Sequence, residues 1–174
     1  LAPFAAGLEI NISCPNIAAG GCAMGSTPEG AAEVIRAVRS HTKRPLLVKM
    51  APARVVEVAQ ALEAEGADAL TVINSISGMA IDVDTRRSRL SRPTGGMSGP
   101  ALHPIAVRMV WEVHNAVNIP IVGVGGVMTG RDAAEFMANL VDPTAAPRIL
   151  DELTEWAESQ GVSDINELIG AFEG

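Results

Sequence analysis

The residues with the clearest chemical potential lie near the amino terminus, in a segment that reads LEINISCPN from Leu8 to Asn16. Apolar and polar residues alternate until a thiol, Cys14, follows the strand pattern, with Asn11 and Asn16 on either side. A free thiol, with a pKa of about 8.5, can act as a general base or nucleophile. Two amides offer paired donors and acceptors to a planar polar ligand. The segment therefore predicts a site in which Cys14 reacts with a ligand that the asparagines hold.

Polar or glycine residues also mark the ends of three later apolar runs, namely Lys49, the pair Asn74 and Ser75, and the pair Gly125 and Gly126. A buried ammonium is costly without a partner, so Lys49 is expected to meet an anion. The alternative is that its side chain reaches water at the strand end. A glycine pair before the helix start TGRD suits amides that bind a phosphate, and equally a tight turn.

These groups are positioned by apolar strands that alternate four times with amphipathic helices, a pattern typical of a parallel sheet covered by helices. The strands are expected at about residues 8–13, 44–50, 68–75 and 118–126, and the helices at 26–42, 55–67, 103–117 and 129–138. Ligands of such sheets bind at the carboxyl ends of the strands. The polar residues are therefore expected to form one site at that edge of a barrel or open sheet.

Other segments have simpler interpretations. Ser26 or Thr27 and, later, Thr129 are expected to cap helices. The motifs AIDVD and RSRLS can pair as a hairpin inside the polar segment 76–100, whose arginines are interpreted as a solvated face. Two helices separated by GVSD are expected between about 143 and 172. Cys22 has no polar company and is interpreted as structural.

Composition excludes several classes of function. The 174 residues are 48% hydrophobic and carry a net charge of −7, which argues against nucleic acid and anionic membranes as partners. Three isolated histidines offer no metal-ligand spacing. No apolar run reaches the length of about 18 residues that a membrane span needs. Without a signal peptide pattern, the cytoplasm is the expected compartment. The chain is expected to be a single domain over 1–174 and part of a longer protein.

Several motifs, in this order, resemble the class 1 dihydroorotate dehydrogenases, and they run from about Leu8 to Arg148. They are INISCPN, LLVKM, LTVINS, GMAIDVDTR, TGGMSGPALHPIAVRMV and IPIVGVGGV. The segments GMAIDVDTR and GGMSGPA resemble the class 1B catalytic subunit. The resemblance implies an α/β fold, a (β/α)8 TIM barrel. In this chain the barrel is expected to lack its amino-terminal strands and one late strand.

The resemblance also implies a role for each matching residue. Cys14 matches the catalytic base. Asn11 matches a residue that touches both flavin and substrate. The remaining substrate contacts are implied at Asn16, Asn74 and Ser75. Lys49 matches a lysine beside the flavin ring, where its charge stabilises the reduced form. Backbone contacts to FMN are implied at Ile73, Gly99, Gly125 and Gly126, the last two at the phosphate.

The implied activity is oxidation of dihydroorotate to orotate with hydride transfer to FMN, in the synthesis of pyrimidines and UMP. Electrons would then pass to NAD through a partner subunit, an iron-sulfur flavoprotein that carries FAD and a 2Fe-2S cluster. The catalytic subunit is expected to form a homodimer. A thiol base further predicts that activity rises with pH as the thiolate forms.

The chain departs from the family pattern after EFM, which continues directly into ANLVDP. Loss of about eleven residues that hold an inner strand would leave neighbouring strands with unpaired backbone groups, a cost that folds seldom tolerate. Two alternatives to the main interpretation remain. One is a flavin enzyme of the dihydropyrimidine dehydrogenase type, and the other is a truncated remnant without catalytic activity.

Overall fold

The computed structural model describes residues 5–13, 24–138, 158–159, 161 and 163. The chain divides into two units, residues 1–140 and 141–174. The sheet and the helices described below belong to the first unit. The two helices expected between about 143 and 172 lie outside the described residues, apart from the four positions above. The expectation of one domain over 1–174 stays a prediction.

Four strands form the central sheet of the first unit. They are β1 (Leu8–Asn11), β2 (Leu46–Lys49), β3 (Ala69–Val72) and β8 (Ile121–Gly123). Their order is β1-β2-β3-β8, and every pairing is parallel. Because β2 and β3 are almost wholly apolar, they suit a parallel sheet with at least one well-buried face. The predicted parallel sheet is confirmed.

The predicted helices are confirmed with shorter bounds, as α2 (Pro28–Arg39), α3 (Val55–Ala64), α4 (His103–His114) and α5 (Gly130–Ala138). Thr27 caps α2, where its side-chain oxygen accepts a hydrogen bond from the Gly30 amide at 3.2 Å. After α3 the chain turns at Gly66, whose φ of 88° favours glycine. A short 3-10 helix, η2 (Pro100–Leu102), leads into α4.

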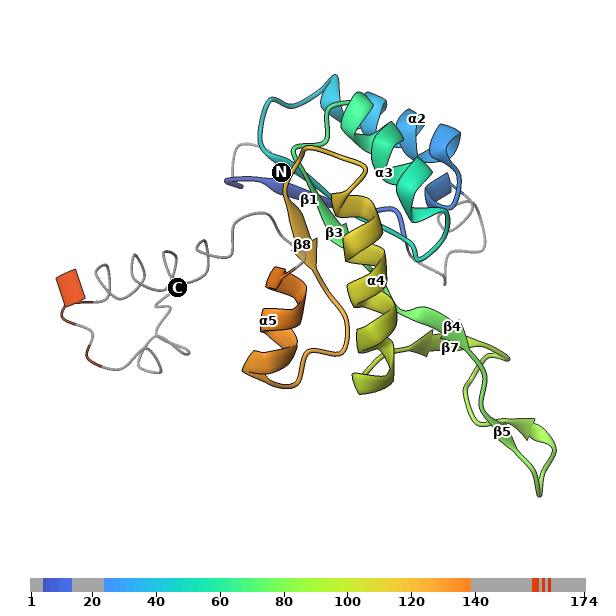
Figure 1. The fold of residues 1–174 in the computed structure, drawn as a ribbon. Helices are drawn as coiled ribbons and strands as arrows, with labels where there is room; N and C mark the ends of the chain where they lie inside the picture. Colours follow the sequence, from blue (N-terminus) through green and yellow to red (C-terminus); the bar gives the residue numbers. More distant parts are fainter. Residues whose placement is uncertain (1–4, 14–23, 139–157, 160, 162, 164–174) are drawn as a thin grey trace. The chain divides into compact units, whose positions relative to one another are not determined.

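The two faces of the sheet have different surroundings. One face carries Val48, Leu70 and Val72, which are fully buried against apolar side chains of the helices. Each such side chain contributes about 1.5–3 kcal/mol to folding. The other face carries residues such as Val122, which is 46% exposed. Helices on one face only are typical of a barrel wall, but the four strands do not close into a barrel within the described residues. Figure 1 shows α2 beside α3, and α4 between α3 and α5.

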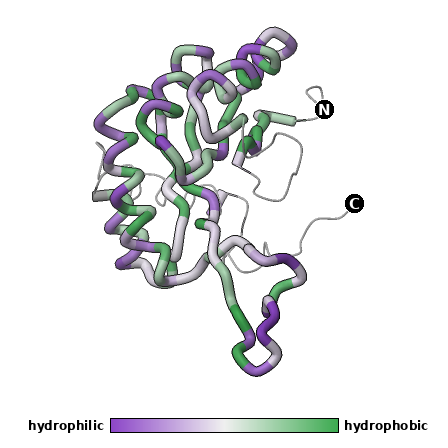
Figure 2. The backbone as a smooth tube through the Cα atoms, turned by 90° about the vertical axis from the view of Figure 1, so that its right-hand side faces the viewer, coloured by the Kyte–Doolittle hydropathy of each residue, from purple (hydrophilic) through white to green (hydrophobic). Residues whose placement is uncertain are grey.

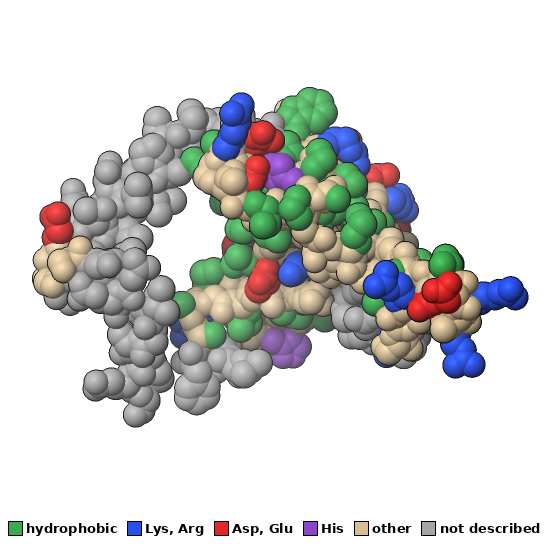
Figure 3. Space-filling view, turned by 90° about the horizontal axis from the view of Figure 1, so that it is seen from below, with side chains coloured by type: hydrophobic (Ala, Val, Ile, Leu, Met, Phe, Trp, Pro, Cys, Tyr) green, Lys and Arg blue, Asp and Glu red, His purple; other side chains and the backbone are tan. Residues whose placement is uncertain are grey.

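An arm formed by residues 76–98 extends from the sheet between β3 and α4 (Figures 1 and 2). At its base, β4 (Ile76–Gly78) pairs antiparallel with β7 (Gly95–Met97). Near its tip, β5 (Ile81–Asp82) pairs with β6 (Arg87–Ser88), so the predicted hairpin is confirmed. The arginines of the arm are exposed, as Figure 3 shows, which fits a solvated face. The β4–β7 pairing was not predicted from the sequence.

Candidate active site

The carboxyl ends of the four strands form one edge of the sheet, here called the carboxyl edge. The strand register aligns Asn11 with Lys49, and Lys49 with Thr71. Paired residues of neighbouring strands point to the same face of a sheet, so these three side chains share the face that the helices leave open. The structure thus brings together two of the residues predicted from the sequence, Asn11 and Lys49, next to a threonine that was not predicted.

Ser13 connects the ends of β1 and β3. Its backbone N–H and its hydroxyl both donate to the side-chain oxygen of Asn11, at 3.0 and 2.7 Å. Its carbonyl oxygen accepts a hydrogen bond of 2.9 Å from the side-chain N–H₂ of Asn74. Ser13 is only 3% exposed, whereas Asn11 is exposed, so the network joins a buried residue to the surface of the carboxyl edge. The two predicted asparagines are therefore linked through Ser13, the residue before Cys14.

The backbone of Ser13 also sets which way the two amides face. A backbone N–H can only donate, so the Asn11 atom that meets it must be the oxygen. A carbonyl can only accept, so the Asn74 atom that meets it must be the nitrogen. Within the described part of the chain, the N–H₂ of Asn11 and the side-chain oxygen and second N–H of Asn74 have no partner and are available to a ligand. Together these groups complement a ligand with an acceptor and a donor side by side, such as a cyclic amide.

Lys49, at the end of β2, is half-buried. Among the described residues, no carboxylate forms an ion pair with its ammonium and no side chain or carbonyl accepts a hydrogen bond from it. The Arg36 and Arg39 side chains, by contrast, each pair with an acid. A partly buried cation without a protein partner favours an anionic or electron-rich ligand. The expectation that Lys49 serves a bound group stays a prediction.

Three glycines predicted to contact FMN gather beside the start of α4. Gly99, Gly125 and Gly126 have φ angles of 102°, 144° and 66°, which favour glycine. A Cβ atom at Gly126 would lie 2.6 Å from the Gly99 carbonyl oxygen and 2.8 Å from the His103 nitrogen. Within the described residues, neither the Gly125 nor the Gly126 amide donates to a protein group. A tight turn with free amides can bind an anion.

Ile73 and Ser75 flank Asn74 where β3 leaves the sheet. Ile73 is 1% exposed, and its backbone N–H donates to the Val124 carbonyl at 3.2 Å. The structure thus places the backbone of Ile73 beside the chain that leads into the glycine turn. Ser75 lies against the base of the arm, because a Cβ at Gly96 would lie 2.2 Å from its hydroxyl oxygen. The predicted flavin and substrate contacts of this segment therefore occupy adjacent positions.

The start of α5 is capped by its own side chains. The Asp132 carboxylate accepts hydrogen bonds from the Met128 and Thr129 amides at 2.9 and 2.8 Å, and the Thr129 hydroxyl accepts from the Asp132 amide, as predicted for a cap. The hydrogen bond from the Met128 N–H lowers the pKa of Asp132 most, and the hydrogen bonds with Thr129 lower it further. The carboxylate thus occupies two amides that an anion would otherwise use. The Gly125–Gly126 turn remains the better candidate for a phosphate.

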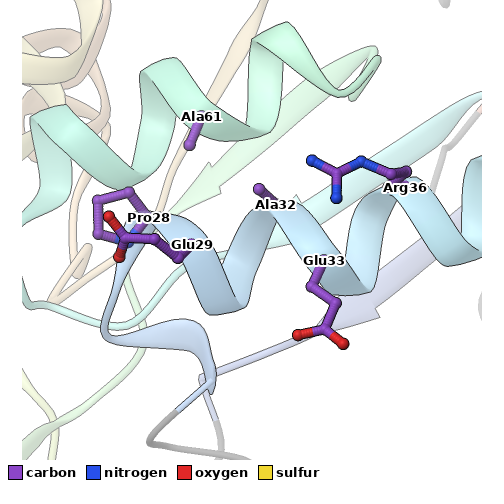
Figure 4. A pocket seen from close by; sticks show the side chains of 6 residues that line it. All are labelled: Pro28, Glu29, Ala32, Glu33, Arg36 and Ala61. Carbon is purple, nitrogen blue, oxygen red and sulfur yellow. The ribbon is translucent and has the colours of Figure 1, made fainter.

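Two surface hollows among the described residues lie away from this edge. One of about 520 Å³ lies between α2 and α3, lined by Pro28, Glu29, Ala32, Glu33, Arg36 and Ala61 (Figure 4). Its carboxylates are spread along α2, and the Glu33 carboxylate points away from Ala61 in Figure 4. The Arg36 guanidinium is already paired with Glu65. This hollow therefore lacks convergent groups that could perform chemistry.

Cys14 and Asn16 lie outside the described residues, and so does Cys22. Ser13 was not predicted as a site residue, although its place directly before Cys14 was a usable signal. His103 was also missed, and its ring nitrogen Nδ1 lies 3.0 Å from the Gly125 carbonyl oxygen. No helix of the described residues is long and apolar enough to cross a membrane.

The family of the chain follows from its match to the dihydroorotate dehydrogenase family model, which covers residues 1–139. The chain belongs to the dihydroorotate dehydrogenase family. The catalytic subunit of dihydroorotate dehydrogenase B (NAD(+)) from Trichlorobacter lovleyi is 47% identical to it, with 99% of this chain and 61% of the relative covered. The corresponding subunit from Geotalea uraniireducens is 48% identical over 98% of this chain and 60% of its own length.

The alignments also show how much of each relative the chain covers. It spans about 60% of the length of the curated relatives that it matches. The Trichlorobacter alignment runs over 185 positions, more than the 174 residues of the chain, so at least 11 of those positions face a gap in it. The absence of a short internal segment after EFM stays a prediction. The match to the family model ends at residue 139, next to the expected break after EFM.

The fold has a solved relative in the crystal structure of a dihydroorotate dehydrogenase from Eimeria tenella in complex with ferulenol. The TM-score is 0.63, with 94% of this chain and 53% of the other chain covered. Sequence identity is 23%, so this likeness concerns the fold alone. It agrees with a parallel α/β sheet.

Proposed function

We propose that this chain is the larger part of the catalytic subunit of a class 1B dihydroorotate dehydrogenase, which oxidises dihydroorotate to orotate. The observation that carries the proposal is the Asn11–Ser13–Asn74 network at the carboxyl edge, directly before Cys14 in the sequence. Its free donor and acceptor groups complement the cyclic amide of dihydroorotate. The family of the chain supports the same substrate.

FMN is the proposed cofactor, and the residues at the edge suit it. The free amides of the Gly125–Gly126 turn, beside Gly99, would hold the phosphate. Lys49 would face the electron-rich edge of the ring and the backbone of Ile73 would border it. When bound, FMN supplies the hydride acceptor, a chemistry that no side chain provides.

The residues of the chain would divide the rest of the reaction. The Cys14 thiolate would take the proton from C5 of dihydroorotate and become a thiol. The C6 hydrogen would leave as a hydride to the bound FMN, so the substrate loses one proton and one hydride in all. Asn11, Asn16, Asn74 and Ser75 would hold the ring in place, which lowers the entropic cost of the step. Because the base must be deprotonated, the rate should rise with pH toward the pKa of the thiol.

The wider assignments rest on the same family. We propose that the complete protein closes a (β/α)8 barrel and forms a homodimer in the cytoplasm. Electrons would pass to NAD through an iron-sulfur flavoprotein with FAD and a 2Fe-2S cluster, in the pathway to UMP. The names of the two bacterial relatives, which specify NAD(+) and a catalytic subunit, support an electron-transfer partner.

The experiment uses the full-length gene product and its Cys14→Ser variant, each reduced anaerobically with dihydroorotate while the flavin absorbance is followed. We expect fast bleaching of the wild type and bleaching slowed by about 10²-fold or more in the variant, with FMN still bound. Bleaching by dihydrouracil but not by dihydroorotate would favour a dihydropyrimidine dehydrogenase. A protein that takes up no FMN would instead be a non-catalytic remnant.

A further inference from the structure

His103, the first residue of α4, is a buried side chain that the proposed reaction does not use. It is 8% exposed, and its Nδ1 lies 3.0 Å from the carbonyl oxygen of Gly125. Since a carbonyl only accepts, Nδ1 must carry the proton in this contact. His103 therefore donates a hydrogen bond to the turn that contains the two glycines.

This hydrogen bond also determines where the next amide points. The peptide bond between Gly125 and Gly126 is not among the cis bonds of the described residues. In a trans peptide the C=O and the following N–H point in opposite directions. Holding the Gly125 carbonyl toward His103 therefore aims the Gly126 N–H away from the helix. That amide has no acceptor among the described residues, so it is available to a ligand.

The other side of the imidazole is held by α5. The Phe136 ring packs edge-on against it, with ring centroids 5.0 Å apart and an interplanar angle of 88°. The Glu135 carboxylate lies 3.3 Å from its Nε2, an atom that is buried and has no hydrogen-bond partner among the described residues. His103 thus bridges the start of α4, the glycine turn and α5. The backbone of His103 also packs against Gly126, where a Cβ would lie only 2.8 Å from the His103 nitrogen.

We propose that His103 is a positioning residue for the phosphate of the flavin, which it serves by orienting the Gly126 amide through the Gly125 carbonyl. The inference rests on the proposed FMN site. It also makes a distinction that a purely structural role would not make. The effect should fall on the phosphate of FMN and not on the flavin ring, because only the turn is oriented.

The test is a fluorescence titration of the full-length apoprotein with FMN and with riboflavin, which lacks the phosphate. The variants are His103→Asn and His103→Leu. The amide nitrogen of asparagine is as many bonds from Cα as Nδ1 of histidine, so it can donate to the same carbonyl, whereas leucine cannot. We expect His103→Leu to weaken FMN binding by about tenfold and to leave riboflavin binding unchanged. The FMN affinity of His103→Asn should stay within about threefold of that of the wild type.

The outcomes separate this inference from the proposed function. If the wild type binds FMN no more tightly than riboflavin, the proposed phosphate site fails. If the wild type prefers FMN and His103→Leu keeps that preference, the site stands and the role of His103 is refuted. An equal loss of FMN affinity in the asparagine and leucine variants would also refute the role of His103. If the leucine variant does not fold, His103→Gln replaces it, because its amide nitrogen lies one bond too far out to reproduce Nδ1.

Discussion

The two edges of the parallel sheet use their polar groups in opposite ways. At the amino edge, where the strands begin, Arg39 donates to the Gly66 and Arg44 carbonyls and to the Asp68 carboxylate. The same carboxylate accepts the Leu46 amide at 2.7 Å. At the carboxyl edge, the Lys49 ammonium and the glycine amides have no protein partner among the described residues.

This difference separates stabilising from binding groups without reference to any ligand. A polar group whose donors and acceptors are all used by protein partners has none left for a ligand, so its direct effect is on the stability of the fold. A group that is partly buried and keeps a free donor or acceptor pays a desolvation penalty that only a ligand can offset. The contrast therefore predicts that substitutions at the amino edge change stability, and that those at the carboxyl edge change binding and catalysis.

The largest expected effect is at Lys49. Lys49→Met removes the unpaired cation and should lower the rate of anaerobic flavin reduction by dihydroorotate about 10²-fold, with a more negative flavin potential. The stability should hardly change, because the ammonium forms no ion pair or hydrogen bond with any residue that the structure describes. Lys49→Arg, which keeps the charge, is the control and should recover part of the rate. A flavin reduction rate of Lys49→Met within about threefold of the wild-type rate would contradict the proposed role of Lys49.

The next effect is at Asn74, the residue at which the two roles overlap. Asn74→Asp sets a carboxylate oxygen against the Ser13 carbonyl and removes the 2.9 Å hydrogen bond. We expect orotate to bind at least about tenfold more weakly and the free energy of unfolding to fall by about 1–2 kcal/mol. Titration with orotate and urea unfolding measure the two quantities. Unchanged affinity with lowered stability would make Asn74 a purely structural residue.

At the amino edge, Asp68→Asn tests stability alone. Burial by itself would raise the pKa of the Asp68 carboxyl, but the Leu46 N–H and the Arg39 guanidinium lower it below its ordinary value. The side chain is 53% exposed, so solvent screening limits the loss in the variant to about 1 kcal/mol. A lowered pKa stabilises the fold above the unfolded pKa of about 3.9. The difference in unfolding free energy between the variant and the wild type should therefore be largest near pH 6. It should vanish as the pH falls through the pKa of Asp68 in the folded protein.

Urea unfolding of both proteins between pH 3 and 7 measures this dependence. A difference that persists undiminished at pH 3 would show that the charge of Asp68 is not its source.

The smallest effect is expected at the exposed pair of Arg36 and Glu65, which links α2 and α3 at 2.9 Å. The hydrogen bond and the charge of Arg36 lower the pKa of Glu65. The Arg36 side chain, however, is 65% exposed. Glu65→Gln should lower the melting temperature less than Asp68→Asn does, and 0.5 M salt should remove most of the difference. A larger loss than at Asp68 would mean that the outer helical surface contributes more than the sheet edge.

The strands and helices could be predicted from the sequence because local patterns determine them. The strand end at Lys49 and the cap at Thr129 were also predictable, since each depends on neighbouring residues, whereas β8 ends at Gly123, before the predicted Gly125–Gly126 end. The role of Ser13 could not be predicted, because its hydrogen bond to Asn74 joins residues 61 positions apart. The role of His103 could not be predicted for the same reason, since its contact with Gly125 spans 22 positions. Tertiary hydrogen bonds of this kind leave no periodic signal in the sequence.

The most direct test of the contrast compares two nearly isosteric exchanges, Asn11→Asp at the carboxyl edge and Asp68→Asn at the amino edge. In the first, the carboxylate can still accept both hydrogen bonds from Ser13, but the free N–H₂ is lost and a negative charge faces the anionic ligand. Orotate affinity and unfolding free energy are measured for both variants of the full-length protein. We predict that Asn11→Asp weakens orotate binding by about tenfold or more with little loss of stability, and that Asp68→Asn does the reverse. Two variants that lose both properties together would contradict the division between the two edges.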